Sequence, residues 1–216
     1  MHPDHPTESP EAGAFDYRRA RLEHYLDRAQ ECLSMRRYLA ARTPLESVLS
    51  LDPANSQARS LQEKIHDSLS SLSRPFREMA PGEPGRRTGS LLVMTVDQDE
   101  NLLLRMARGM TRYGFLSVSA GNYREAVELL GRIRPDIIFS EVNFENGPAG
   151  FDLYLWVRTN ARLEDVPFIF LASRVDREAL IAGKRLGVND FITKPFDEAV
   201  VHASIVSVLG RRARLR

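Results

Sequence analysis

The second half of the sequence predicts an α/β fold with a parallel sheet, and the first half predicts a small all-α module. Short apolar runs in the second half, such as those at 91–96 and 168–172, alternate with stretches of helical spacing. Nearly continuous apolar runs indicate strands that are buried on both faces, and their alternation with helices is typical of a parallel sheet covered on both sides. Residues 16–72 show helical spacing instead.

Five apolar runs define the expected strands. The stretches between them repeat apolar residues at helical spacing, as Leu102, Met106 and Met110 do. Gly187 lies where the C-cap of the fourth helix is expected. Five such units predict a flavodoxin-like, doubly wound, five-stranded parallel sheet of order 2-1-3-4-5. The expected strands are LLVMTV (91–96), FLSV (115–118), DIIFS (136–140), FIFLA (168–172) and DFIT (190–193).

Composition divides the chain into four expected parts. Residues 1–15 are polar and proline-rich, which favours a disordered tail because they leave little to bury. Residues 16–72 form the helical module. Residues 73–90 are rich in proline and glycine, which is typical of a linker. Residues 91–212 form the α/β domain.

Charge and composition argue against several classes of protein. The chain has 30 basic and 29 acidic side chains, a balance that does not indicate a nucleic-acid partner. Cys32 is the only cysteine, so neither an intrachain disulfide nor a cysteine metal cluster can form. Apolar runs fall short of the ~18 residues of a membrane span. The N-terminus lacks the pattern of a secretory signal, so a cytoplasmic protein is expected.

Charged side chains follow three of the expected strands. Asp97 follows the first strand, Glu141 ends the third, and Lys194 follows the fifth. In the predicted fold the carboxyl ends of these strands converge, which brings the three side chains to one edge of the sheet. Two carboxylates and an ammonium group can make a cation or phosphoryl site, or an ion cluster that satisfies itself. Spacing alone leaves both readings open.

Motifs in the second half resemble the receiver domain of response regulators (CheY-like). The resemblance extends over residues 91–210, and GVNDFITKPF is its most specific part. It implies two-component or phosphorelay signalling of the bacterial type. The motifs, in chain order, are LLVMTVDQDE, RPDIIFSEVNF, GFDL, VPFIFLAS and GVNDFITKPFDEA.

The resemblance assigns roles to the residues of the acidic pocket, and two of them depart from the family. Glu141 occupies the position of the aspartate that accepts phosphate. Asp97 matches the first of two acids that hold Mg²⁺, but Gln98 replaces the second. Asn143 matches the position whose backbone carbonyl binds the metal. Asp97, Glu141 and Asn143 are thus expected to bind Mg²⁺ weakly if at all, and no other cofactor is implied.

Three further positions correspond to those that sense the phosphoryl group in the family. Lys194 retains the lysine that neutralises phosphoryl oxygens. Ala172 replaces the usual threonine or serine, and Phe191 matches the switch aromatic but has no hydroxyl. We expect Phe191 to be largely buried and Glu141 to lie within salt-bridge reach of Lys194. The loop from Glu141 to Gly150 is one residue longer than is usual in the family.

These departures favour a degenerate, or pseudo-, receiver that acts as an adaptor through protein–protein interaction and is not an enzyme. In the sharper form of this hypothesis Glu141 mimics the phosphorylated state. In the weaker form the domain has lost switching and keeps only a docking surface. An orthodox, phosphorylatable response regulator is the first alternative. A flavodoxin-like cofactor-binding domain is less favoured, because no glycine-rich phosphate loop follows any strand.

The stretch RRYLAARTPLESVLSLDPANSQA resembles a tetratricopeptide (TPR) repeat, although Pro44 departs from that motif. Since solenoids usually need three or more repeats, a single repeat is expected to pack against itself, the receiver or a second chain. A simple helical hairpin without a partner is the alternative. The expected partners are a signalling kinase or an effector. They would bind the fourth and fifth helices of the receiver, at about 176–210, and the TPR-like module. A homodimer is left open.

Overall fold

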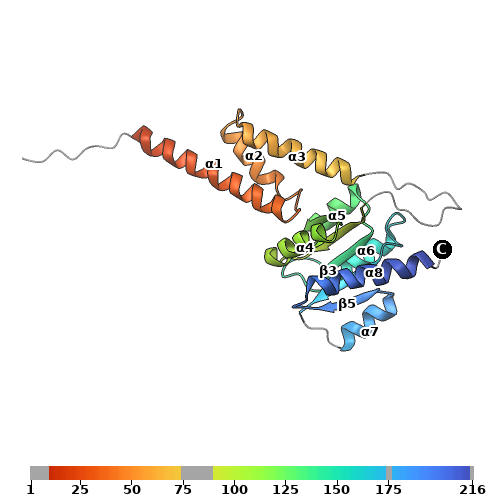
Figure 1. Ribbon diagram of the computed structural model, residues 1–216. Helices are drawn as coiled ribbons and strands as arrows, with labels where there is room; N and C mark the ends of the chain where they lie inside the picture. Colours follow the sequence, from red (N-terminus) through yellow and green to blue (C-terminus); the bar gives the residue numbers. More distant parts are fainter. Residues whose placement is uncertain (1–9, 74–89, 174–176, 215–216) are drawn as a thin grey trace, which may run out of the picture.

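The structure, a computed structural model, describes residues 10–73, 90–173 and 177–214. Three helices, α1 (Pro10–Ser34), α2 (Arg42–Leu51) and α3 (Ser56–Leu72), precede an α/β domain. They pack at one end of that domain (Figure 1). No helix within the described ranges is long and apolar enough to cross a membrane.

The three N-terminal helices pack around a small core of their own. Ala29, Leu45, Val48 and Ala58 are fully buried there. Asn55 caps α3, because its side-chain oxygen accepts a hydrogen bond from the amide of Ala58 at 2.9 Å. The helical spacing of the sequence therefore predicted this module correctly, whereas its identity as a TPR-like repeat remains a proposal.

Proline at position 44 is compatible with the second helix. Pro44 is the third residue of α2. A helix leaves its first amide groups without intrahelical partners, so a residue without an N–H costs little in this turn. The departure from the TPR pattern thus has no structural consequence for the helix itself.

The structure describes part of the four stretches into which composition divides the chain. Helix α1 begins at Pro10, inside the stretch 1–15 for which the composition favours a tail. Ala12 and Ala14 are strong helix formers, a preference that the polar and proline-rich composition of this stretch conceals. Nearly all of the expected linker at 73–90 lies outside the described residues. The four-part division therefore remains a proposal.

Five parallel strands form the sheet, in the order β2-β1-β3-β4-β5 that the sequence predicted. Every residue of β1, β3 and β4 is buried, which explains their continuous apolar character. The strands are β1 (Leu92–Val96), β2 (Leu116–Ala120), β3 (Ile137–Glu141), β4 (Phe168–Ala172) and β5 (Asp190–Thr193).

Helices cover both faces of the sheet. Met106 of α4 and Val201 of α8 pack on one face with Val93 and Phe139. On the other face the core includes Leu129 of α5 and Leu153 of α6, and it continues into the N-terminal helices. Gly187 follows α7 with a φ of +84°, the left-handed conformation expected of a C-cap glycine. The helices are α4 (Glu100–Arg112), α5 (Tyr123–Arg132), α6 (Gly150–Thr159), α7 (Arg177–Leu186) and α8 (Glu198–Arg214).

Candidate functional site

Three charged side chains meet at the carboxyl edge of the sheet, as the strand ends predicted. The ammonium nitrogen of Lys194 lies 2.5 Å from Asp97 Oδ2 and 2.5 Å from Glu141 Oε2. The exposed fractions of the side chains are 1% for Asp97, 9% for Glu141 and 14% for Lys194. The expected salt bridge between Glu141 and Lys194 is therefore confirmed. We call these three residues the charged trio.

Backbone amides hold the two carboxylates of the trio in place. The second oxygen of Asp97, Oδ1, accepts a hydrogen bond from the amide of Asp99 at 2.9 Å. Glu141 Oε1 accepts one from the amide of Asn143 at 3.0 Å. Each carboxylate thus uses one oxygen for the backbone and the other for Lys194. This arrangement satisfies both buried anions.

Burial and ion pairing act in opposite directions on the protonation of the trio. Burial raises the pKa of Asp97, and the hydrogen bonds from Lys194 and from the amide of Asp99 only partly offset this effect. Burial also acts to lower the pKa of Lys194, but its hydrogen bonds with Asp97 and Glu141 outweigh burial and raise it. Lys194 therefore remains charged at neutral pH and supplies the positive charge that the two carboxylates require.

A glycine lets α6 begin directly against the backbone of Glu141. The amide of Gly150 donates to the carbonyl oxygen of Val142 at 2.8 Å. A Cβ atom at position 150 would lie 2.0 Å from the carbonyl oxygen of Glu141, far inside van der Waals contact. Only glycine permits this approach without a shift of the backbone. The GFDL motif contributes to the site through this glycine, a role that its spacing alone did not predict.

The side chain of Gln98 ties two loops together. Its Oε1 atom accepts a hydrogen bond from the amide of Glu145 at 2.6 Å. Gln98 therefore joins the loop after β1 to the loop after β3.

Within the described ranges, the structure has no group of three or more His, Cys, Asp or Glu side chains that could hold a metal ion.

The acidic pocket does not fit Mg²⁺ as it is arranged. The ammonium group of Lys194 bridges Asp97 and Glu141, the two carboxylates that a metal would need. Magnesium requires several oxygen ligands in near-octahedral geometry, and an acidic side chain is missing at Gln98. The assignment of Asp97, Glu141 and Asn143 as weak metal ligands stays a prediction.

We predict that Mg²⁺ binds the parent weakly, with a dissociation constant well above ordinary cellular concentrations of Mg²⁺. Gln98→Asp should make the binding tighter. The substitution adds an anionic oxygen ligand, which hard cations prefer. Calorimetric titration of Mg²⁺ into the parent and the variant measures both. The exposed Gln62→Asp change on α3 is the matched control, since it adds the same charge far from the pocket. Tight binding to the parent, or no difference between the parent and Gln98→Asp, would contradict the prediction.

Ala172 and Phe191 are the two remaining positions to which the resemblance assigns a sensing role, and that role stays a prediction. Ala172 ends β4 and is 2% exposed, and its carbonyl oxygen accepts from the amide of Lys194 at 2.8 Å. Phe191 is partly buried, rather than largely buried as we expected. Its ring packs 5.3 Å from that of Phe170. The ring also lies over Gly183, where an added Cβ atom would be 2.4 Å from Cζ of Phe191. Phe191 lies on β5, the last strand of the order and therefore an edge strand, which leaves it less covered than a residue on a central strand.

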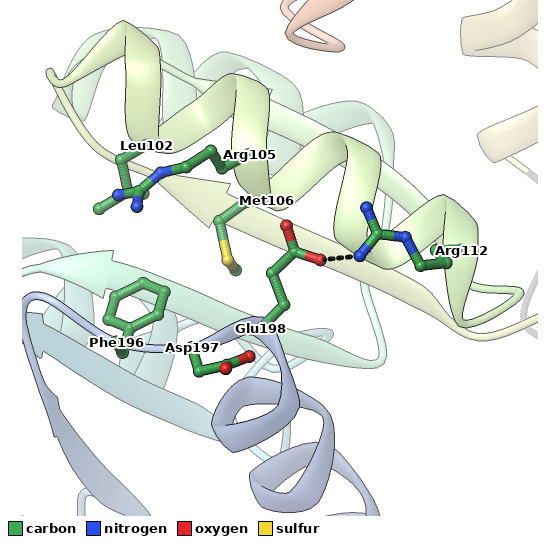
Figure 2. A pocket seen from close by; sticks show the side chains of 7 residues that line it. All are labelled: Leu102, Arg105, Met106, Arg112, Phe196, Asp197 and Glu198. Atoms are coloured by element: carbon green, nitrogen blue, oxygen red, sulfur yellow. Dashed lines mark hydrogen bonds and ion pairs between the residues drawn. The ribbon is translucent and has the colours of Figure 1, made fainter.

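A hollow of about 330 Å³ lies between α4 and the start of α8. Figure 2 shows Arg105 and Met106 on its α4 side and Phe196 on the other, with Arg112 reaching Glu198. Arg112 Nη1 and Glu198 Oε2 are 2.9 Å apart. Phe196 follows Lys194 by two residues, so this hollow adjoins the segment that carries the trio's lysine.

Sequence reasoning missed a second ion cluster, which joins the N-terminal helices to the α/β domain. Arg37, in the turn after α1, reaches Glu100 at 3.0 Å and Glu125 at 2.9 Å. The residues are 63 and 88 positions apart in the chain. The one signal in the sequence was that Glu100 and Glu125 each lie in the first turn of a helix, α4 and α5.

Comparison with known proteins identifies the α/β domain. The family model of the response regulator receiver domain matches residues 93–206. The sensory transduction protein BceR of Halalkalibacterium halodurans is 26% identical over 119 residues, covering 55% of this chain and 50% of that protein. The transcriptional regulatory protein PrrA of Mycobacterium tuberculosis is 30% identical over 120 residues, covering 56% and 50%. The chain spans about half the length of the curated relatives it matches.

Solved structures agree with this match. A response regulator from Desulfuromonas acetoxidans has a TM-score of 0.51 and 28% identity, covering 56% of this chain and 97% of that one. A receiver domain of a histidine kinase from Syntrophus aciditrophicus has a TM-score of 0.51 and 26% identity, covering 56% and 91%. With the five-stranded order and the matched residues 93–206, these likenesses show that the chain belongs to the response regulator receiver family of two-component signalling.

Proposed function

We propose that this receiver is a degenerate, phosphorylation-independent adaptor that works by protein–protein interaction and has no catalytic activity. The observation that carries the proposal is the ion pair of 2.5 Å between Glu141, at the phosphoacceptor position, and Lys194. In the family this lysine neutralises phosphoryl oxygens. Here a carboxylate of the chain itself already does what the phosphoryl group would do.

The chemistry of the pocket favours this proposal over an orthodox, phosphorylatable regulator. Phosphoryl transfer needs an accessible carboxylate oxygen and a metal ion that spreads the developing charge. Both oxygens of Glu141 are engaged, one by the amide of Asn143 and one by Lys194. Glutamate also extends its carboxylate by one methylene, roughly to where a phosphate oxygen would lie. The pocket thus resembles the product of phosphorylation more than its starting point.

A passive docking scaffold is the second candidate, and Ala172 favours it. In the family a hydroxyl at this position couples the acceptor to the switch aromatic, and alanine cannot do so. Phe191 nevertheless packs toward the core, against Phe170, which agrees with an active-like surface. The two candidates differ in whether removal of the Glu141 carboxylate changes the surface that partners bind.

The proposed partner surface is formed by α7 and α8. Large apolar side chains are exposed there, namely Ile181 (40%), Leu186 (44%), Val200 (48%) and Val206 (56%). Exposed large apolar side chains offer surface that a partner can remove from water. We assign this surface to a signalling kinase or an effector in the cytoplasm, with the TPR-like helices as a second protein-binding element. No nucleic-acid contact is proposed, and the same apolar residues suit a homodimer.

Partner binding by Glu141 variants tests the proposal. The parent chain is used as bait to capture a partner protein, which is then purified. The affinity of this partner is measured for the parent chain, for Glu141→Ala and for Glu141→Gln. We expect Glu141→Ala to weaken binding by about fivefold or more without unfolding the domain. Glu128→Ala is the matched control, because Glu128 is an exposed glutamate of α5 in a surface pair with Arg132. Equal affinity of the parent and Glu141→Ala would support the passive scaffold instead.

A further inference from the structure

The N-terminal helices are held on the receiver by an arginine that is nearly buried. The side chain of Arg37 is 12% exposed, and its two terminal nitrogens bind different helices. Nη1 lies 3.0 Å from Glu100 at the start of α4, and Nη2 lies 2.9 Å from Glu125 at the start of α5. Arg28 of α1 adds a second contact to Glu100 at 2.7 Å. We call Arg37, Glu100 and Glu125 the latch.

The receiver surface is shaped to accept the latch arginine. Gly121 follows β2, and an added Cβ there would lie 2.4 Å from Nη2 of Arg37. The amide of Gly121 donates to Glu125 Oε2 at 2.8 Å, which orients that carboxylate toward Arg37. A side chain at position 121 would displace the end of the Arg37 side chain from this position. The fit therefore involves the backbone of the receiver as well as its charges.

The same turn also completes the edge of the sheet. Among the residues that the structure describes, β2 has β1 as its one strand neighbour, so the outer edge of β2 offers backbone groups that no strand pairs. The amide of Ser119, on that edge, donates to the carbonyl oxygen of Arg36 at 3.1 Å. Arg36 has a φ of +59°, a conformation that a non-glycine residue adopts rarely and only when its surroundings hold it. Docking of the helices thus includes one backbone hydrogen bond to the receiver.

A short chain of contacts connects the latch to the charged trio. Asp97 binds Lys194 through one oxygen and the amide of Asp99 through the other. The side chain of Asp99 caps α4 by accepting from the amides of Asn101 and Leu102. Glu100 is the first residue of that helix. The position of Asp97 therefore determines where α4 begins, and hence where Glu100 meets Arg37.

We propose that the helical module is an internal partner of the receiver, and that the charged trio controls how tightly the latch holds it. Loss of the charge of Glu141 or of Lys194 loosens the turn from Asp97 to Asp99 and moves Glu100. The N-terminal helices then undock from the receiver more often. The inference rests on the proposed function only in treating the trio as the site whose state changes. The first element to respond to the state of the charged trio is then the helical module of the same chain.

Hydrogen exchange at single amides tests docking in the full chain. The Ser119 amide reports the docked state, since its partner is Arg36. The Val118 amide faces β1 and reports opening of the sheet itself. Arg37→Ala should speed exchange at Ser119 by about 10- to 100-fold while Val118 keeps its parent rate. Gly121→Ala should act in the same way, and Arg19→Ala, in an exposed pair on α1, should have no effect.

Control by the trio is tested with Glu141→Ala and Lys194→Met under the same conditions. Both should speed exchange at Ser119 relative to Val118 by about 2- to 30-fold, and neither should add to the effect of Arg37→Ala. Glu141→Ala keeps a balanced Lys194–Asp97 pair, so it remains informative if Lys194→Met does not fold. Parent-like exchange at Ser119 in Glu141→Ala would overturn the proposal. That result is independent of partner affinity and of phosphorylation, the two measurements that test the proposed function.

Discussion

Replacement of Lys194 by methionine should lower the free energy of unfolding by about 3–5 kcal/mol at neutral pH. The change removes the ammonium group and leaves Asp97 and Glu141, which are 1% and 9% exposed, without a counter-charge. Methionine fills a similar volume, so the loss reflects charge rather than packing. Urea unfolding of the parent and the variant measures the difference.

Glu141→Ala is the matched control for this experiment. It removes one carboxylate but leaves Lys194 paired with Asp97 at 2.5 Å, so no buried charge is left without a partner. We expect a smaller cost of about 1–2 kcal/mol, because the variant loses the two hydrogen bonds of this carboxylate, with the Asn143 amide and with Lys194. If the two variants were equally unstable, the ion pairs of the trio could not be the source of the stability.

The deficit of Lys194→Met should depend on pH with a defined sign. The pKa of Lys194 is raised, so its contribution is complete below the ordinary lysine value of about 10.5 and is lost as the pH rises through the raised value. Burial raises the pKa of Asp97, so its unpaired carboxylate in the variant takes up a proton above the ordinary aspartate range. The deficit should therefore be greatest near neutral pH and shrink at both extremes. A deficit that does not change with pH would contradict this account.

Gly150→Ala should lower the free energy of unfolding by about 1–3 kcal/mol. The new Cβ atom would lie 2.0 Å from the carbonyl oxygen of Glu141 and 3.0 Å from that of Val142, so the backbone must shift. The shift would move the start of α6 away from Glu141 at the end of β3 and from Asn143 in the loop that follows. Chemical denaturation measures the loss of stability.

Gly131→Ala is the control for Gly150→Ala. Gly131 is also in a helix, α5, and an added Cβ there meets no atom within 4 Å. Alanine favours helix more than glycine does, so this variant should be as stable as the parent or slightly more stable. A similar loss of stability in both variants would show that the close approach at Gly150 is not the cause.

The fold could be predicted from the sequence because its main determinants are local. Continuous apolar runs specify strands buried on both faces, and five alternating units leave few topologies for a parallel sheet. The charged trio followed from the same argument, since carboxyl ends of parallel strands share one edge. Asp97, Glu141 and Lys194 could thus be brought together without any knowledge of their distances.

Contacts between the two modules could not be predicted in this way. Arg37 is one arginine among many, and nothing local indicates that Glu100 and Glu125 will face it. The fit depends on the missing Cβ of Gly121, which becomes meaningful only once the turn after α1 is packed against β2. The exposure of Phe191 was misjudged for a related reason. Its lack of a hydroxyl favours burial, but its place on the edge strand β5 limits the number of neighbours.

The most direct test of the central claim, that the receiver works without phosphorylation, is the intact mass of the chain after incubation with acetyl phosphate and Mg²⁺. An orthodox receiver treated in parallel shows that the donor is active. We predict no added phosphoryl group on the parent, because Glu141 is already bonded to Lys194 and Asn143 and the pocket does not fit the metal. A mass gain of one phosphoryl group that maps to Glu141 or Asp97 would contradict the claim and make the chain an orthodox, phosphorylatable response regulator.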